Sequence, residues 1–424
     1  MDCACCKQYV QILKEELIPA MGCTEPIAVA YAAAKAREVL GCMPEHTLVE
    51  VSGNIVKNVK SVIVPHTGGL YGIEAATAAG IVAGKADKEL EVISEVTDAQ
   101  VAEIGAYLKQ ADIKVAHAAT GKIFDIIITM EAQGHTSKVR IVDRHTNVVT
   151  VMKDDAYLVN EPVDGVATAV EKTDRSILSL RGIVEFANSC GLDLVRDLLD
   201  KQIESNMAIA EEGLKGSYGA NIGQMMLLRG QDVQTKVRAW AAAGSDARMN
   251  GCEMPVYINS GSGNQGITVT VPVVVYGRET GKTQEQIYRA LLVSNLVAIH
   301  IKTGIGTLSA YCGAVSAGVA AGCAIAYMED GSYEAIAHTL INAIAIDSGL
   351  ICDGAKASCA AKIASSVDSG LLGYEMYKQG NNFRGGDGIL QDDAEHTIRN
   401  VGSLARNGMV GTDQEIIRIM VEGE

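Results

Sequence analysis

The sequence predicts an α+β protein with a mainly helical domain, rich in alanine and glycine, and an inserted α/β sheet subdomain. Two patterns carry this prediction. From about residue 46, runs such as HTLVEVSG and KIFDIIITME are rich in β-branched residues and are separated by turn residues, as strands are. After about residue 171, helical patterns follow one another and are broken only by loops. The chain is therefore expected to divide into residues 1–45, 46–155 and 156–424.

The N-terminal residues predict two helices that pack on the helical domain. The apolar residues of the first helix share one face and comprise Tyr9, Val10, Ile12, Leu13 and Leu17. The second helix is expected to begin after Thr24, a good N-cap residue, and to stop at Gly41. In the sheet subdomain, helices are expected near 72–83 and 99–109, and the last strands are expected to form an antiparallel meander.

Residues 303–328 form a stretch without charge that is long enough to span a bilayer. The stretch consists mostly of Gly, Ala, Ser, Thr and Cys, and no cluster of Lys and Arg flanks it, so its composition does not favour a membrane span. We predict a buried helix instead, in which Gly318 and Gly322 allow a second backbone to approach closely.

Composition excludes several classes of protein. The 424 residues include 36 Lys and Arg against 51 Asp and Glu, a net charge of −15 without a basic stripe, so nucleic acid is not expected as a partner. The N-terminus MDCACCKQYV lacks an apolar run after a basic segment, so no presequence is predicted and a cytoplasmic location is expected. The 11 cysteines are then reduced thiols, ligands or reactive groups rather than a disulfide framework.

Most cysteines are expected to have no special role. Three of them stand among apolar or small residues and are interpreted as core residues: Cys42, Cys190 and Cys323. Cys3, Cys5 and Cys6 are crowded together as metal ligands often are, but they lie at a terminus that is expected to fray.

Two glycine-rich motifs resemble phosphate-binding loops. GRETGKT, at 277–283, has three residues instead of four between its first Gly and the Gly-Lys pair, so we interpret it as a surface turn. SGSGNQG, at 260–266, has the dinucleotide spacing, but the following ITVTVPVVV is β-branched, contains Pro272 and does not predict the helix of a Rossmann unit. The motif is therefore either a carboxylate-binding loop or a tight connection between core segments.

Cys23, in the motif MGCTEP, precedes a predicted helix N-terminus. The free N–H groups and the dipole at such a position lower the pKa of a thiol, which favours a thiolate that acts as base or nucleophile. The alternative is a small packed residue.

Cys312, Cys352 and Cys359 are dispersed along a glycine-rich helical region. Zinc sites have close pairs such as C-x-x-C, and none occurs in the body of the chain. Three dispersed thiols suit an iron–sulfur cluster better, with one iron left open, although buried structural thiols remain the alternative.

Five motifs, taken together, resemble the iron–sulfur-dependent L-cysteine desulfidase family, which is related to the bacterial iron–sulfur L-serine dehydratases. The motifs are MGCTEP, HTGG, SGSGNQG, YCGA and CDGAKASC, and the likeness runs from about residue 8 to 420. The resemblance implies that Cys312, Cys352 and Cys359 ligate a 4Fe-4S cluster. It also implies that Cys23 is the proton acceptor of the reaction.

The resemblance further implies elimination of hydrogen sulfide from L-cysteine, a small amino-acid substrate, to give pyruvate and ammonia without pyridoxal phosphate. An open iron would withdraw charge as a Lewis acid while the Cys23 thiolate removes the α-proton. Two loops are expected to hold the substrate carboxylate and ammonium. Their residues are His66, Thr67, Gly68, Ser260, Ser262, Gly263, Asn264 and Gln265.

Other functions stay open at this point. L-serine dehydration is the alternative within the same chemistry, because serine and cysteine differ at one atom. A pyridoxal-phosphate enzyme would use a lysine such as Lys302 or Lys356. An iron–sulfur electron carrier or sensor, or a metal-free amino-acid-binding protein, would need no base at Cys23. Assembly into a homo-oligomer is also left open.

Overall fold

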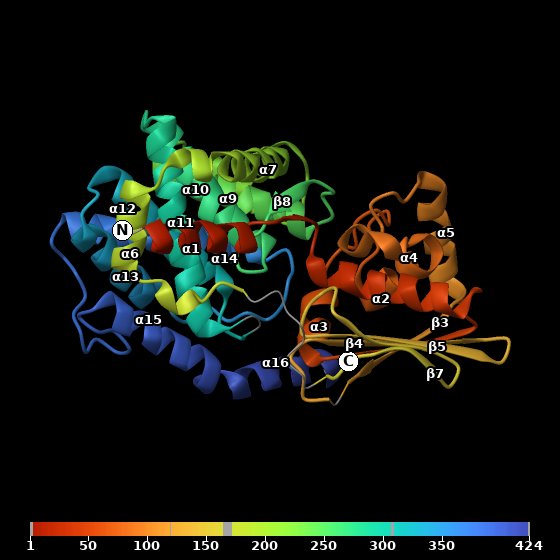
Figure 1. Cartoon of the computed structure of the whole chain (residues 1–424). Coiled ribbons are helices and arrows are strands. Elements are labelled where there is room, and N and C mark those ends of the chain that lie inside the picture. Colours follow the sequence, from red (N-terminus) through yellow and green to blue (C-terminus); the bar gives the residue numbers. More distant parts are fainter. Residues whose placement is uncertain (1–2, 119, 164–171, 307–308, 423–424) are drawn as a thin grey trace.

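The computed structural model describes residues 3–118, 120–163, 172–306 and 309–422 and confirms the predicted α+β fold. Two bodies lie side by side, a helical domain and a six-stranded sheet with helices over one face (Figure 1). Each body has its own large apolar core.

The sheet contains the strands that the sequence predicts. They are β2 (His46–Val51), β3 (Asp112–His117), β4 (Asp125–Ala132), β5 (His135–Val142), β6 (Val148–Lys153) and β7 (Ala156–Asn160). β2 pairs with β3 in parallel, whereas β4 to β7 pair in succession as antiparallel neighbours, which confirms the predicted meander. β7 lies just beyond residue 155, the expected end of the subdomain. Buried and exposed residues alternate along β2, so one face of the sheet faces the core.

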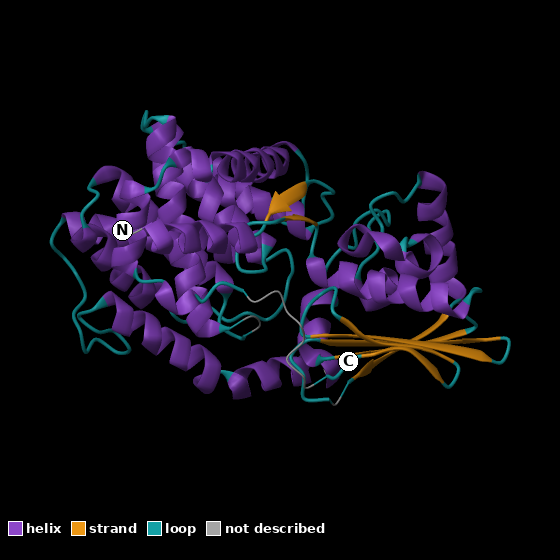
Figure 2. Cartoon of the chain, viewed as in Figure 1, coloured by secondary structure: helices purple, strands orange, loops and turns teal. Residues whose placement is uncertain are grey.

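Helices cover only one face of the sheet (Figure 2). They are α2 (Thr24–Leu40), α4 (Gly72–Ala83) and α5 (Asp98–Gln110), and the short α3 (Gly53–Val59) follows β2. α2 packs on β4, β5 and α4. Gly80 lets α4 approach α2, because a Cβ at Gly80 would lie 2.1 Å from the carbonyl oxygen of Ala30. The structure thus departs from the expectation that both N-terminal helices pack on the helical domain: the alanine-rich α2 is buried against the sheet subdomain.

The helical domain is built from helices of 6 to 22 residues, most of which surround one apolar core. They are α1 (Cys3–Glu16), α6 (Leu180–Ser189), α7 (Arg196–Lys215), α8 (Ile222–Leu227), α9 (Val233–Met249), α10 (Gly263–Glu279), α11 (Gln284–Ile305), α12 (Gly313–Glu329), α13 (Tyr333–Asp347), α14 (Cys359–Lys378), α15 (Ala394–Ser403) and α16 (Val410–Glu422). Two short strands, β1 (Pro19–Met21) and β8 (Pro255–Tyr257), pair as an antiparallel ladder. α1 is helical from Cys3 onward, and its predicted apolar face is buried, so the expectation of a frayed terminus at Cys5 and Cys6 is wrong.

Close packing of α12 and α14 confirms the predicted role of two glycines. A Cβ at Gly322 would lie 2.5 Å from the Cα of Gly370, and a Cβ at Gly318 would lie 2.4 Å from the carbonyl carbon of Ser366. The two backbones therefore meet where small residues face each other. In the part of the chain that is described, no helix has the length and apolar character needed to cross a membrane.

One local prediction is wrong, because the run ITVTVPVVV lies inside α10. Its residues are buried on all sides among α7, α9, α11 and α12, so tertiary contacts outweigh the strand preference of β-branched side chains. The hydroxyls of Thr268 and Thr270 donate to carbonyl oxygens one turn earlier, at 2.7 Å each, which also satisfies them within the helix. A Rossmann unit stays excluded, because α10 packs among helices and not on a parallel sheet.

Candidate active site

Two helix N-termini and a loop bring the predicted ligand cysteines together. Cys312 is the N-cap of α12, and Cys359 is the first residue of α14. Cys352 lies on the loop before α14. A short antiparallel bridge fixes it beside Cys312: the Cys312 N–H donates to the Leu350 oxygen at 3.1 Å, and the Cys352 N–H donates to the Ala310 oxygen at 2.7 Å. We call Cys312, Cys352 and Cys359 the cysteine triad.

The thiols of Cys312 and Cys352 are hydrogen-bonded to each other, and both interact electrostatically with Cys359. The hydrogen bond from Cys312 lowers the pKa of Cys352, with further help from the Lys57 charge and the Gly354 N–H. The same hydrogen bond, together with burial, raises the pKa of Cys312. Cys312 is therefore the donor and Cys352 the acceptor of this hydrogen bond, and binding of a metal to the two sulfurs would displace the proton between them.

Two buried lysines surround the cysteine triad with positive charge. Burial lowers the pKa of Lys302 to about 8, although the charges of Cys352 and Cys312 act in the opposite direction. Lys57 is 1% exposed at its side chain and pairs with Asp413 of α16 at 2.5 Å. Gly354 packs directly on the Lys57 backbone, since a Cβ there would lie 2.0 Å from the Lys57 carbonyl oxygen. The loop that carries Cys352 is thereby fixed against α3.

The donor set fits an iron–sulfur cluster by its chemistry. Within the described residues, no three or more His, Cys, Asp or Glu side chains are arranged as a preformed metal site. The three donors are nevertheless all thiols, and thiolates are the ligands of iron–sulfur clusters. Lys302 has no carboxylate partner among the residues described, and a buried cation without a counter-charge is costly. An anionic thiolate-bound cluster would supply that counter-charge.

Cys23 lies next to the cysteine triad. It packs with Val62 and Met249 in a small apolar cluster, against which Cys359 and Ala355 also pack. Cys23 is the N-cap of α2, so the helix begins one residue earlier than the expected cap at position 24. The structure therefore brings together two features that the sequence separates by more than 300 residues, the GCTEP motif and the CDGAKASC loop.

The predicted lowering of the Cys23 pKa is wrong. Burial raises this pKa well above its usual range, and the charge of Glu25 adds to the effect, although Arg248 opposes it. The Cys23 thiol donates to Glu25 Oε2 at 3.1 Å, and Asn58 Nδ2 donates to the other oxygen of this carboxylate at 3.3 Å. Desolvation and a neighbouring anion thus outweigh the helix dipole, and the thiol is protonated with a carboxylate as its hydrogen-bond acceptor.

The SGSGNQG loop meets the triad at the N-terminus of α10. Ser262 caps this helix by accepting a hydrogen bond from the Gln265 N–H at 3.4 Å, and Ser260 has a left-handed backbone with φ of 50°. The amide of Gln265 packs on Gly313, where a Cβ would lie 2.7 Å from Nε2. Since Gly313 directly follows Cys312, the loop lies beside the triad. Gln265 Oε1 is buried and has no hydrogen-bond partner in the part of the chain described.

Arg248, at the end of α9, is a site residue that sequence reasoning missed. Its guanidinium donates to Asn264 Oδ1 at 3.2 Å and to the Gly22 oxygen at 2.9 Å, so it links the SGSGNQG loop to the residue before Cys23. Gly263 makes room for it, because a Cβ there would lie 2.2 Å from Arg248 Nε. The available signal was a lone arginine in the alanine-rich segment AWAAAGSDARM, where a charge is expected to be buried.

The HTGG loop borders the same region from the sheet subdomain. Gly22 packs on Pro65, the residue before His66, because a Cβ at Gly22 would lie 2.5 Å from the Pro65 ring. His66 pairs with Glu253 through Nδ1 at 3.1 Å, and its Nε2 is buried without a partner among the described residues. The Thr67 hydroxyl is already used, since it donates to the Val64 oxygen at 2.7 Å. Gly68 has a φ of 70° and shapes the turn.

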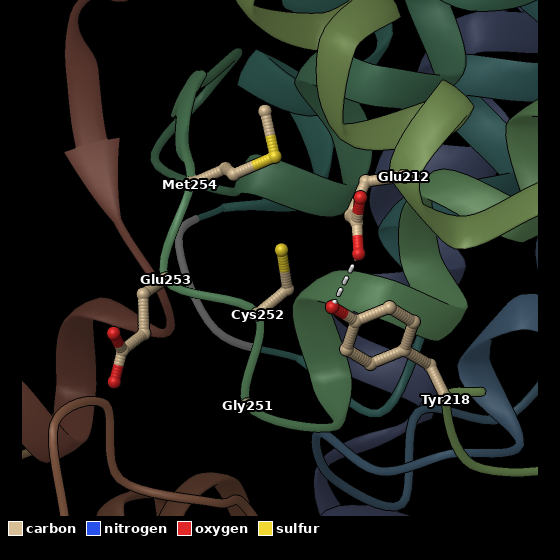
Figure 3. Close-up of a pocket in the computed structure, with 6 residues that line it drawn as sticks. All are labelled: Glu212, Tyr218, Gly251, Cys252, Glu253 and Met254. Atoms are coloured by element: carbon tan, nitrogen blue, oxygen red, sulfur yellow. Dashed lines mark hydrogen bonds between the residues drawn. The ribbon is translucent and has the colours of Figure 1, made fainter. Parts of the chain in front are cut away.

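One cavity lies between the HTGG loop and the helical domain, and a second lies next to it within the helical domain. The smaller, about 250 Å³, is lined by HTGG residues and by Asn250, Gly251 and Glu253. The larger, about 400 Å³, shares Gly251 and Glu253 and also contains Glu212, which accepts from the Tyr218 hydroxyl at 2.8 Å (Figure 3). No residue of the cysteine triad lines either cavity, so neither is assigned to the cluster region.

The crowded N-terminal cysteines form a different environment. Cys5 and Cys6 pack against the helical core, whereas the side chain of Cys3 lies outside the described part of the structure. The thiol of Cys6 is hydrogen-bonded to that of Cys190, and burial, followed by the charge of Cys6, raises the pKa of Cys190 to about 11. Cys190 and Cys323 are buried, as predicted for core residues.

The fold and the site define an α+β protein in which three partly buried thiols, of a kind that soft metal groups bind, lie beside a further, buried cysteine. The sequence profile of the serine dehydratase alpha chain family matches residues 87–418. The chain belongs to this family, and the family indicates an iron–sulfur lyase of the serine dehydratase type.

Several relatives match over almost their whole length. A UPF0597 protein of Desulfitobacterium hafniense is 56% identical over 414 residues, which cover 97% of this chain and 96% of that protein. A UPF0597 protein of Finegoldia magna is 49% identical over 418 residues, 98% of this chain and all of that protein. A UPF0597 protein of Bacteroides fragilis is 39% identical over 422 residues. The profile match confirms the predicted relation to the serine dehydratases, and the names of these relatives do not specify a substrate.

Proposed function

We propose that the chain is an iron–sulfur lyase that eliminates hydrogen sulfide from L-cysteine and gives pyruvate and ammonia. The observation that carries the proposal is the contact of two sites: Cys23 packs in one small cluster with Cys359, the third member of the cysteine triad. A base next to an open metal site is what removal of a weakly acidic α-proton requires.

In this proposal the cysteine triad holds a 4Fe-4S cluster. When bound, the cluster supplies a Lewis acid that withdraws charge from the substrate. Lys57 and Lys302 offset the negative charge of the bound group. The N-termini of α12 and α14 add to this effect, because the positive ends of their helix dipoles also favour a negative group.

Cys23 acts as the proton acceptor. Its own proton must leave first, and Glu25 is placed to take it because Glu25 Oε2 lies 3.1 Å from the sulfur. The raised pKa of Cys23 makes the resulting thiolate a strong base. The α-proton then moves to the Cys23 sulfur, the C–S bond breaks with its electron pair leaving on sulfur, and the aminoacrylate product tautomerises and hydrolyses to pyruvate and ammonia.

L-serine dehydration is the second candidate within the same family. The two substrates differ only in the leaving atom, and the family profile carries the name of serine dehydratase. Side-by-side pyruvate formation from L-cysteine and L-serine by anaerobically purified protein decides between them. Faster turnover of L-cysteine is expected, and a kcat/KM for L-serine far above that for L-cysteine would reverse the order.

Iron and acid-labile sulfide content per chain tests the cluster itself. Four irons and four sulfides per chain are expected after anaerobic purification. Protein without iron, in which borohydride reduction traps pyridoxal phosphate on a lysine such as Lys302 or Lys356, would instead establish pyridoxal-phosphate chemistry. A bound cluster without lyase turnover on either amino acid would favour an electron carrier or sensor.

A further inference from the structure

Arg248 is a buried cation that forms no ion pair with a carboxylate among the described residues. Its side chain is almost fully enclosed, with the residue 5% exposed, and its guanidinium donates to uncharged oxygens of Asn264 and Gly22. Its Nε, which is also buried, has no hydrogen-bond partner in the described part of the chain. Burial of a guanidinium whose charge and donors are not compensated is costly, so this position favours a bound anion, which no described residue in hydrogen-bond contact with Arg248 supplies.

The N-terminus of α10 lies directly against this guanidinium. Gly263, the first residue of the 17-residue helix, contacts Arg248 closely enough that no Cβ would fit. The N–H groups of Gly263 and Asn264 have no partner within the helix, since they belong to its first turn. Helix N-termini attract anions through these donors and the helix dipole. The unpaired Nε and the helix start therefore converge on one anion site.

The anion site lies close to both Cys23 and the cysteine triad. Arg248 contacts the carbonyl of Gly22, the residue before Cys23, and the next residue after Arg248, Met249, packs with Cys23. Gln265, two residues beyond Gly263, packs on Gly313 beside the ligand Cys312. An anion at Arg248 would thus lie between the proposed base and the cysteine triad. The unpaired Oε1 of Gln265 adds a hydrogen-bond acceptor for a cationic group next to it.

We infer that Arg248 binds the α-carboxylate of the substrate and restricts the enzyme to amino acids whose carboxylate is free. The guanidinium and the first turn of α10 hold the carboxylate, and the Gln265 amide oxygen faces the neighbouring ammonium. This fixes the α-carbon between Cys23 and the triad. The inference rests on the proposed function only in taking a small α-amino acid as the ligand.

A binding experiment tests the inference without turnover. L-alanine has no leaving group, and L-alaninamide differs from it by the missing negative charge. Calorimetric titration of the anaerobic holoenzyme should show L-alanine binding at least about 30-fold more tightly than L-alaninamide. Arg248→Met should abolish this preference, and Arg248→Lys should retain part of it because lysine keeps the charge but loses the planar fork. Equal binding of the two compounds by the wild-type protein would overturn the inference.

A kinetic experiment provides the second readout. Arg248→Met should lower kcat/KM for L-cysteine about 100-fold and change that for L-cysteinamide less than about threefold. Arg238→Met is the matched control, because Arg238 lies on the same helix but pairs with Asp368. Iron content verifies that each variant is intact. An equal loss for both substrates would make Arg248 a structural link and overturn the inference. Absence of wild-type turnover would instead contradict the proposed reaction, with the alanine titration still deciding the carboxylate site.

Discussion

The helical domain contains two groups of cysteines. The members of one group are neighbours in the sequence, whereas those of the other are far apart in the sequence and come together in the fold. Cys5 and Cys6 are neighbours in the chain, and both pack against an apolar core, where Cys6 meets the thiol of Cys190. The cysteine triad is spread from 312 to 359, yet its thiols interact with one another.

The surroundings of the two groups explain their different chemistry. Burial dominates at Cys190 and raises its pKa to about 11, which keeps this thiol protonated and inert. At the triad, the hydrogen bond from the Cys312 thiol lowers the pKa of Cys352, and the charges of Lys57 and Lys302 and the Gly354 N–H act in the same direction. The two groups thus differ in what surrounds each thiol, and the spacing of the cysteines in the chain does not reveal this difference.

The largest expected effect comes from removing one member of the triad. Cys352→Ser should reduce the iron content to less than about a tenth of the wild-type value, because a hydroxyl is a poor ligand for iron–sulfur clusters. Lyase activity should fall in parallel. Iron analysis and pyruvate formation after anaerobic purification measure both. Cys6→Ser is the matched control and should retain full iron; full iron in Cys352→Ser would remove Cys352 from the ligand set.

A substitution at Cys23 shows whether this residue is a metal ligand or a catalytic base. Cys23→Ser should retain the cluster but lower kcat by about 10²- to 10⁴-fold, since a hydroxyl is a far weaker proton acceptor than a thiolate at this position. Iron content and turnover of L-cysteine are measured on one preparation. If iron is lost to the same extent as in Cys352→Ser, Cys23 is a ligand and not the base.

A substitution at Lys302 tests whether positive charge distinguishes the surroundings of the triad from those of Cys5 and Cys6. Lys302→Met removes the buried cation that has no carboxylate partner among the described residues, so a negatively charged cluster should be lost to a chelator about tenfold faster. The rate of iron release in the presence of a chelator is the measurement. Lys215→Met, on the exposed end of α7, is the control. Identical release rates in the two variants would show that Lys302 does not stabilise the bound group.

The smallest effect is expected for a substitution at Cys6, near the N-terminus. Cys6→Ser removes the thiol contact with Cys190 at a partly buried position and should lower the free energy of unfolding by about 1 kcal/mol. Thermal unfolding of wild type and variant measures this, and iron content should not change. A loss of iron in Cys6→Ser would contradict the division into a structural pair and a ligand triad.

Much of the local structure could be predicted because it is encoded by short-range patterns. The strand runs, the helices near 72–83 and 99–109, the buried face around Tyr9 and the glycines of α12 all have the predicted structure. Hydrophobic periodicity and small-residue spacing are properties of neighbouring residues, so the chain alone reveals them. The family relation likewise follows from motifs that stand in the printed sequence.

Long-range packing decided the rest. Burial among helices turned the β-branched run ITVTVPVVV into α10, and the alanine-rich surface of α2 packs against the sheet rather than on the helical domain. Burial beside Glu25 raised the pKa of Cys23, where the helix N-terminus by itself predicts a lower one. Short-range patterns in the sequence were enough to predict the class of fold, the cysteines worth testing and the family. Only the tertiary structure placed Arg248, Lys57 and Lys302 at the site, because desolvation and charge pairing depend on residues far apart in the chain.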